Sequence, residues 1–157
     1  MYPVSHIILT FIVLYPRMPE AEPLPRGNRV GIVTLSGGAG VMAADACFQS
    51  GLHLAELDYH TLQKIGERMP SWATVGHPVD IEPLTETVNR VEAYKIAFEA
   101  VLSDKNVDLC LFIMGTMRMS KADVSFLGDI KNAYPKKPMA VCVNRKTRYL
   151  PAVLRQR

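Results

Sequence analysis

The chain has 157 residues, of which 48% are hydrophobic and 21% are charged. This length fits one ordinary globular domain and excludes a complete enzyme that needs separate domains for cofactor and substrate. The net charge is +3, and its excess lies in the tail from Asn144 to Arg157, which holds five basic residues and no acidic one. The rest of the chain has 13 basic against 15 acidic residues, so it is not a surface built to bind nucleic acid.

The cysteines indicate the type of compartment. Cys47, Cys110 and Cys142 are widely spaced and form no C-x-x-C pair, so they predict neither a disulfide framework nor a zinc site. We therefore expect no metal site and a cytoplasmic location.

Residues 1–28 are expected to lie outside the folded domain. The stretch His6 to Tyr15 is strongly apolar, but about ten residues are too few to span a bilayer, which takes about twenty, and no secretion signal is evident. This arm is expected to pair with a second copy of the chain and form a homo-oligomer. A proline-rich linker follows it. The predicted organisation is thus arm and linker over 1–28, a domain over 29–143 and a basic tail over 144–157.

From Arg29 onward, strand and helix patterns alternate. Short apolar runs rich in β-branched residues predict buried strands at Val30–Leu35, Val107–Met114 and Pro138–Val143, with a weaker strand at His53–Leu57. Helices are predicted over Val41–Ser50 with Gly51 as the C′ residue, over Tyr59–Arg68, over about twenty residues from Leu84 to Leu102, and over Lys121–Tyr134. This alternation predicts an α/β fold with an open parallel sheet and helices on both faces.

The loops that follow the strands are the places to look for chemistry, because they gather at the carboxyl edge of a parallel sheet. Three loops are candidates: Ser36–Gly40, Thr74–Asp80 and Gly115–Ser120. The first is expected to be a tight turn, and its glycines together with the N–H groups of the next helix predict a site for a phosphate or carboxylate. The predicted phosphate-binding residues are Ser36, Gly37, Gly38, Ala39 and Gly40.

Three further residues are predicted to lie near the ligand, none of them in a catalytic role. A histidine in a proline-containing loop, such as His77, is more often a hydrogen-bonding or solvated residue than a nucleophile. Asp80 either accepts hydrogen bonds from backbone amides of the adjacent loop or orients a ligand. The guanidinium of Arg118, after a strand, can clamp phosphate.

The glycine loop also matches a dinucleotide-binding fingerprint. Gly38 to Ala43 satisfies G-x-G-x-x-G/A between a strand and a helix, and Glu56 or Asp58 lies near the distance at which an acidic residue meets the ribose. A Rossmann-type module is therefore an alternative. A serine-hydrolase elbow and a P-loop are excluded, because Thr34 replaces the first glycine of the elbow and no lysine follows Gly40.

Five segments resemble the ligase-CoA domain of ADP-forming acyl-CoA (acetate–CoA) synthetases, in the succinyl-CoA synthetase superfamily. They are Arg26–Thr34 (RGNRVGIVT), Ser36–Val41 (SGGAGV), Ala44–Cys47 (ADAC), Gly51-Leu52 and Pro78–Asp80 (PVD). The resemblance implies a flavodoxin-like domain whose helix, from about Gly38, points its N-terminus at a phosphohistidine. It further implies a full enzyme that converts acyl-CoA, ADP and phosphate into acid, CoA and ATP.

The chain also departs from that family. None of its four histidines lies in a Gly-His-Ala-Gly or Ser-His-Thr-Gly segment of the kind that carries the phosphohistidine, and His77 stands where relatives commonly have asparagine. The CoA-binding and ATP-grasp domains are implied as partners, and ATP or ADP, CoA and Mg²⁺ as ligands of the full enzyme, with no cofactor for this domain alone. The isolated chain is therefore expected to be inactive. A non-catalytic interaction or regulatory domain derived from the ligase fold is a further alternative.

Overall fold

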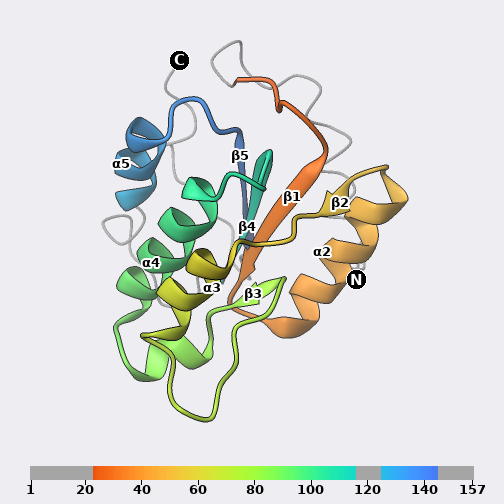
Figure 1. Ribbon diagram of the computed structural model, residues 1–157. Helices are drawn as coiled ribbons and strands as arrows, with labels where there is room; N and C mark the ends of the chain where they lie inside the picture. Colours follow the sequence, from red (N-terminus) through yellow and green to blue (C-terminus); the bar gives the residue numbers. More distant parts are fainter. Residues whose placement is uncertain (1–22, 116–124, 145–157) are drawn as a thin grey trace.

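A computed structural model describes residues 23–115 and 125–144 of the chain (Figure 1). The strands are β1 (Arg29–Thr34), β2 (His53–Leu54), β3 (Val79–Asp80), β4 (Leu109–Gly115) and β5 (Met139–Asn144). The helices are α2 (Gly37–Gln49), α3 (Tyr59–Gly66), α4 (Arg90–Ser103) and α5 (Phe126–Ala133), and a short 3-10 turn, η1 (Pro83–Glu86), precedes α4. Strands and helices thus alternate along the chain as predicted.

All five strands run parallel in one sheet; four of them follow in the order β2-β1-β4-β5, and β3 pairs with β1 outside this order. Both β2 and β3 pair with the same edge of β1, with His53 opposite Arg29 near its start and Asp80 opposite Thr34 at its end. The chain first moves from β1 to this edge and then crosses back to β4 on the other side of β1. Such a reversal is the topological switch point of an open α/β sheet, where ligands of this fold class bind.

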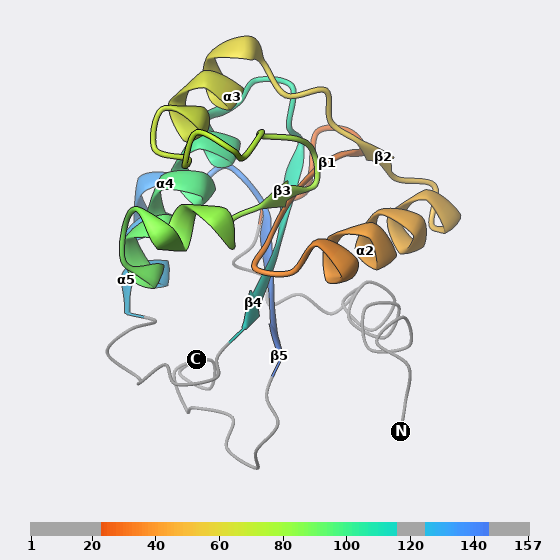
Figure 2. The same cartoon turned by 90° about the horizontal axis from the view of Figure 1, so that it is seen from below.

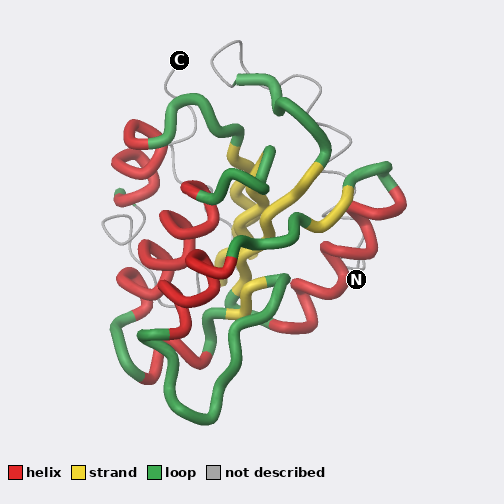
Figure 3. Tube along the Cα trace, viewed as in Figure 1, coloured by secondary structure: helices red, strands yellow, loops and turns green. Residues whose placement is uncertain are grey.

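The sheet lies between two helical layers, as the central strands and flanking helices of Figure 3 show. Helix α2 covers one face, and α3, α4 and α5 lie on the other (Figure 1). Side chains alternate between the faces: in β1, Val30 and Ile32 pack with α2, whereas Val33 joins the core under α4. The expected flavodoxin-like three-layer arrangement is confirmed.

The two cores differ in size because the helices that cover them differ. The core under α2 is thin and rests on small residues of that helix, Ala43, Ala46 and Cys47. The core under α4 is larger and includes Phe98, whose ring stacks on Phe112 of β4 with centroids 3.6 Å apart. The thin core lets α2 approach the sheet closely, which is important for the site at its N-terminus.

Helix α2 begins earlier than the sequence predicted. A tight turn was expected over Ser36–Gly40 and a helix from Val41, but the helix already begins at Gly37, and Gly40 N donates to Ser36 O at 3.0 Å. The prediction of the turn was wrong because three glycines favour turns in isolation, whereas packing against β1 and β3 holds them in a helix. The predicted end is confirmed: Gly51 follows the helix with a φ of 78°, a conformation that glycine adopts readily.

Two other predictions need correction. The helix expected over about twenty residues from Leu84 is divided into η1 and α4, because Asn89 starts a new helix by accepting a hydrogen bond from Glu92 N at 3.0 Å. The loop Thr74–Asp80 ends in strand β3, which two residues are too few to reveal by periodicity. The arm, residues 116–120 of the third loop and the tail from 145 lie outside the described residues.

Candidate functional site

The glycine loop lies at the topological switch point. It leads from the end of β1 into α2, and Figure 2, which views the molecule from below, shows the start of α2 beside β3. The loop after β4, on the other side of this point, begins at residue 116 and lies outside the described residues. This applies to Arg118 as well, so its predicted role as a phosphate clamp remains a prediction.

The start of α2 is open to solvent. Ser36 is the N-cap residue in an extended conformation, but its side chain makes no capping hydrogen bond, and the first turn holds no acidic residue. The loop is instead held by the last residue of β1, because Thr34 Oγ1 donates to Ser36 O and accepts from Ser36 N, each at 3.0 Å. Ser36, Gly37 and Gly38 are exposed. The first N–H groups of the helix therefore point to an accessible region of partial positive charge.

Three side chains, those of Thr34, Pro78 and Asp80, lie against the glycines of this loop. A Cβ atom on Gly40 would lie 3.0 Å from Cγ2 of Thr34 and 3.1 Å from Cβ of Pro78. A Cβ atom on Gly37 would lie 3.0 Å from Oδ2 of Asp80, whereas one on Gly38 would have no atom within 4 Å. The segment from Pro78 to Asp80 thus packs directly against the glycines, and Gly38 faces open space.

Asp80 places a carboxylate at the edge of the helix N-terminus. Its Oδ1 accepts a hydrogen bond from Glu82 N at 3.0 Å, while Oδ2 faces Gly37. One oxygen therefore holds the following loop and the other faces the candidate anion site. A carboxylate in this position repels a bound anion unless it shares a proton or a cation with it.

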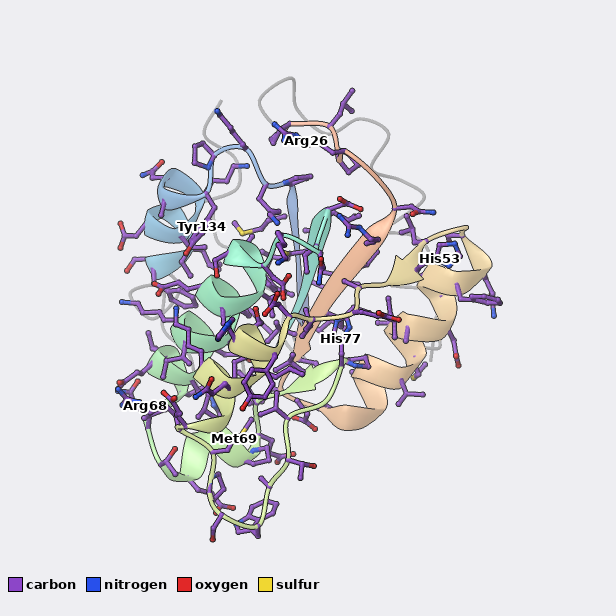
Figure 4. The ribbon with its side chains drawn as sticks, viewed as in Figure 1. Arg26, His53, Arg68, Met69, His77 and Tyr134 are labelled. Atoms are coloured by element: carbon purple, nitrogen blue, oxygen red, sulfur yellow. The ribbon has the colours of Figure 1, made fainter. Side chains whose placement is uncertain are left out.

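His77 is tied to the sheet by both ring nitrogens. Nε2 accepts a hydrogen bond from Ile32 N of β1 at 2.8 Å, and Nδ1 lies 2.8 Å from the carbonyl oxygen of Ala55, just after β2. Figure 4 shows the His77 ring between β1, β3 and the chain that leaves β2. The ring is therefore held by the backbone rather than free to attack a phosphoryl group, in agreement with the hydrogen-bonding role favoured from the sequence.

The environment of His77 favours its neutral form. Burial lowers the pKa of the imidazole below its ordinary value of 6.5, while the hydrogen bond to Ala55 and the negative charge of Asp104 act in the opposite direction. Because Nε2 accepts from an amide, the proton of the neutral ring lies on Nδ1 and is donated to Ala55 O. No residue pattern in the sequence indicates this bridge, since its partners are 45 and 22 residues away.

The dinucleotide alternative needs Glu56 or Asp58 beside the glycine loop. The backbone of Glu56 instead lies beside Asn106, just before β4, where Asn106 Nδ2 donates to Glu56 O at 2.9 Å. Strand β2 ends beside Val30, four residues before the end of β1. Asp58 lies farther along, where its amide donates to Asp104 Oδ2 at 2.8 Å and its carboxylate pairs with Lys105, residues that precede β4. Asp58 is thus on the amino side of the sheet, away from the glycine loop, and this placement disfavours a ribose contact.

Charged ligands at this site would be held mainly by backbone groups. Within 23–115 and 125–144, no three histidine, cysteine or acidic side chains come together in a way that could hold a metal ion. The arrangement at the start of α2 is suited to binding and stabilising an anion rather than to acid–base chemistry.

The helices within these same ranges include none long and apolar enough to cross a membrane.

Comparison with known proteins identifies the family. A family model described as "Ligase-CoA domain" matches residues 30–118, from Val30 in β1 to beyond the end of β4. The chain belongs to the Ligase-CoA domain family. This assignment agrees with the resemblance found in the sequence.

Two curated relatives of this ligase-CoA domain are ADP-forming acetate–CoA ligases. Acetate–CoA ligase [ADP-forming] II of Archaeoglobus fulgidus is 38% identical over 123 residues, covering 78% of this chain and 18% of the relative. The alpha subunit of Acetate–CoA ligase [ADP-forming] II of Pyrococcus furiosus is 39% identical over 92 residues, covering 59% of this chain and 19% of the relative. The chain thus spans about a fifth of the length of these relatives and corresponds to one part of them.

Solved structures share the fold. A crystal structure of a protein from Pyrococcus horikoshii has a TM-score of 0.69 and 26% identity, covering 92% of this chain and 32% of the other. The acetyl-coenzyme A synthetase 1 of Ca. Korarchaeum cryptofilum, solved in complex with phosphate and ADP, has a TM-score of 0.66 and 21% identity, covering 90% of this chain and 29% of the other. At 21% identity, the match to the synthetase shows a shared fold.

Proposed function

We propose that this ligase-CoA domain acts as one component of an ADP-forming acid–CoA ligase and contributes the N-terminus of α2 as a phosphate site. The observation that carries the proposal is the exposed, uncapped start of α2 at the switch point of the sheet. Three comparisons support it: the family of the chain, the ADP-forming ligases among its relatives, and the phosphate bound in one structural neighbour. The proposed binding residues are Ser36, Gly37, Gly38, Ala39 and Gly40, with Asp80, His77 and Arg118 near the ligand.

The contribution of the domain to the reaction would be electrostatic. When a phosphoryl group passes between a phosphohistidine and another acceptor, its oxygens carry negative charge throughout. The N–H groups of Gly37, Gly38 and Ala39 are already aligned by α2, so they stabilise that charge with little reorganisation. In this arrangement the histidine segment is supplied by another domain, as are the binding sites for CoA and for ADP or ATP with Mg²⁺.

The assembly follows from this division of roles. We propose that the domain begins at Arg29 and ends one residue beyond the predicted 143, because Asn144 is the last residue of β5. We propose that 1–28 and 145–157 flank it as an apolar arm with linker and a basic tail, and that the chain works as a homo-oligomer in the cytoplasm beside CoA-binding and ATP-grasp domains. Alone, it is expected to form no ATP from acyl-CoA, ADP and phosphate. Measurable ATP formation by the pure chain would contradict this division.

The phosphate site is tested by adding one charge. Gly38 faces open space, so Gly38→Asp places a carboxylate beside the helix N-terminus without a steric clash, and Gly38→Asn is the matched control without the charge. Charges about 4 Å apart repel by about 1 kcal/mol in water and by more near a protein surface, so Gly38→Asp is expected to weaken phosphate binding about five-fold or more.

Binding is measured by titrating the ¹⁵N-labelled protein with phosphate and following its amide NMR signals. In the natural chain, the amides of Gly37, Gly38 and Ala39 should shift together and saturate, and Gly38→Asn should bind within about two-fold of it. Shifts confined to other loops, or equal affinity in the Asp and Asn variants, would exclude this site.

A further inference from the structure

We propose that His77 is a positioning residue for the glycine loop: its imidazole joins β1 to the interrupted edge of the sheet and so fixes the segment Pro78–Asp80 that forms the wall of the loop. The proposal rests on the proposed function of this loop as an anion site. It assigns His77 no contact with the anion.

The first step is the gap in the sheet. Ala55 N donates to Val30 O at 2.9 Å, so the next bond of a regular parallel ladder would run from Ile32 N to Ala55 O. The His77 ring is inserted at that place, accepting from Ile32 N and donating to Ala55 O, each at 2.8 Å. Beyond it the pairing with β1 continues in β3, where Ile81 N donates to Thr34 O at 2.9 Å. One imidazole thus completes an edge that β2 and β3 form in two pieces.

The second step connects the ring to the loop. Pro78, the next residue, lies against Gly40, and Asp80, two residues farther, lies against Gly37. Val79 between them is fully buried and pairs with Val33. Because the ring holds one end of this short segment and the β3 pairing the other, its position against the glycines depends on both.

The third step is protonation. A protonated ring carries N–H groups on both nitrogens, so Nε2 can no longer accept from Ile32 N and two donors face each other. Among the described residues, Asp104, after α4, is the charged group whose field acts on the ring. Its carboxylate already accepts from the amides of Asp58 and Asn106. β1 presents apolar residues here, and in β3 Val79 is apolar while Asp80 faces Gly37.

This bridge predicts an unusual pH dependence. A histidine close to a bound anion is stabilised in its charged form, so a direct contact makes binding tighter at low pH and raises the pKa of the ring. Positioning predicts the reverse, because the neutral ring holds the loop that binds. By reciprocity, an anion that prefers the neutral-ring state lowers the pKa of His77.

The first measurement needs no anion. The ¹⁵N and ¹³C signals of the natural chain are followed between pH 8 and pH 5, together with His77→Gln, which keeps a donor and an acceptor but does not titrate. The control is His53→Gln, at an exposed histidine of β2. The amides of Gly37, Gly38 and Asp80 are expected to titrate with the His77 ring in the natural chain and in the control, and to lose that transition in His77→Gln. Loop amides whose signals do not titrate with the His77 ring would overturn the proposal.

The second measurement uses inorganic sulfate, whose charge stays constant over this range. Relative to pH 8, the apparent dissociation constant should about double at the pKa of the ring and increase about ten-fold one pH unit below it, because only the neutral-ring fraction binds. His77→Gln should remove this component, and saturating sulfate should lower the pKa of His77. A raised pKa, or tighter binding at low pH through His77, would overturn positioning in favour of direct contact.

The two measurements separate this proposal from the proposed function. If sulfate does not bind near Gly37 at any pH but the loop amides follow the ring, the anion site is wrong and the role of His77 in placing the loop holds. If sulfate binds with an unchanged pH profile in His77→Gln and the loop amides do not titrate with the ring, the anion site holds and the role of His77 is wrong.

Discussion

At the scale of single residues, Gly40 shows how tightly the site is built. It is the point at which α2 meets both β1 and the segment before β3, and a Cβ atom there would approach Thr34 and Pro78 to about 3 Å. Gly38, two residues earlier in the same helix, has free space. The two glycines therefore differ: Gly40 allows close packing, whereas Gly38 lies at the open N-terminus of α2, where a side chain has room.

These two positions provide a matched pair of substitutions. Gly40→Ala is expected to destabilise the domain by about 1–2 kcal/mol, because overpacking costs more than the gain in helix propensity. Gly38→Ala should be neutral or stabilising by up to about 1 kcal/mol, because the gain in propensity is unopposed. Urea unfolding followed by circular dichroism measures both. Equal effects of the two substitutions would show that close packing does not determine the identity of residue 40.

At the scale of elements, α4 depends on its own cap. Its apolar residues form the centre of the larger core, with Tyr94, Ala97 and Phe98 fully buried. The Asn89 side chain starts the helix by accepting from Glu92 N, and the Thr87 hydroxyl just before it donates to Arg68 O at 2.6 Å. The break between η1 and α4 is thus held in place by polar contacts of its own.

Removing the cap should weaken the helix that covers the core. Asn89→Ala is expected to lower the free energy of unfolding by about 1 kcal/mol, because the N–H of Glu92 loses its partner, while Asn89→Ser should stay within about 0.5 kcal/mol of the natural chain. Thermal unfolding of the three proteins provides the comparison. An alanine variant as stable as the serine variant would mean that the side chain of Asn89 contributes no capping energy.

At the scale of the whole molecule, two charged side chains, Arg29 and Lys137, join the amino ends of the strands, opposite the site. Arg29 Nε and Nη2 donate to the Asp108 carboxylate at 2.8 and 2.9 Å, and Arg29 N donates to the same group. Lys137, before β5, donates to the carbonyls of Asp104 and Val107. These contacts join the starts of β1, β4 and β5, so they align the three strands whose other ends surround the site.

The Arg29–Asp108 pair predicts how the free energy of unfolding changes at low pH. The side chain of Arg29, chiefly through its hydrogen bond, lowers the pKa of Asp108 from 3.8 to about 2. Since the folded protein binds this proton less readily than the unfolded chain, the contribution of Asp108 is complete above about pH 4 and is lost as the pH falls toward 2. Asp108→Asn should therefore be less stable at pH 7 and lose less stability between pH 4 and pH 2.

The measurement is urea unfolding at several pH values. Arg29→Gln removes the cause of the shift and should flatten the same interval. If natural chain and both variants lose stability in parallel between pH 4 and pH 2, the Arg29–Asp108 pair does not contribute to acid sensitivity.

The sequence by itself determined the elements whose evidence is local. The apolar runs of β1, β4 and β5 identified the strands, the alternation of strands and helices identified a parallel sheet, and the φ of Gly51 agrees with its predicted place after α2. The position of the glycine loop followed as well, because it connects a recognisable strand to a recognisable helix. These signals lie within a few residues of the features they predict.

Only the tertiary structure decided the details of the candidate site. Strand β3 has two residues and no periodicity of its own, so it exists only because β1 offers it a partner. His77 bridges Ile32 and Ala55, and the limits on Gly40 come from Thr34 and Pro78. Apart from the contact between Thr34 and Gly40, these contacts join residues at least 22 positions apart. Such a contact depends on how the chain packs rather than on any local preference of the residues that make it.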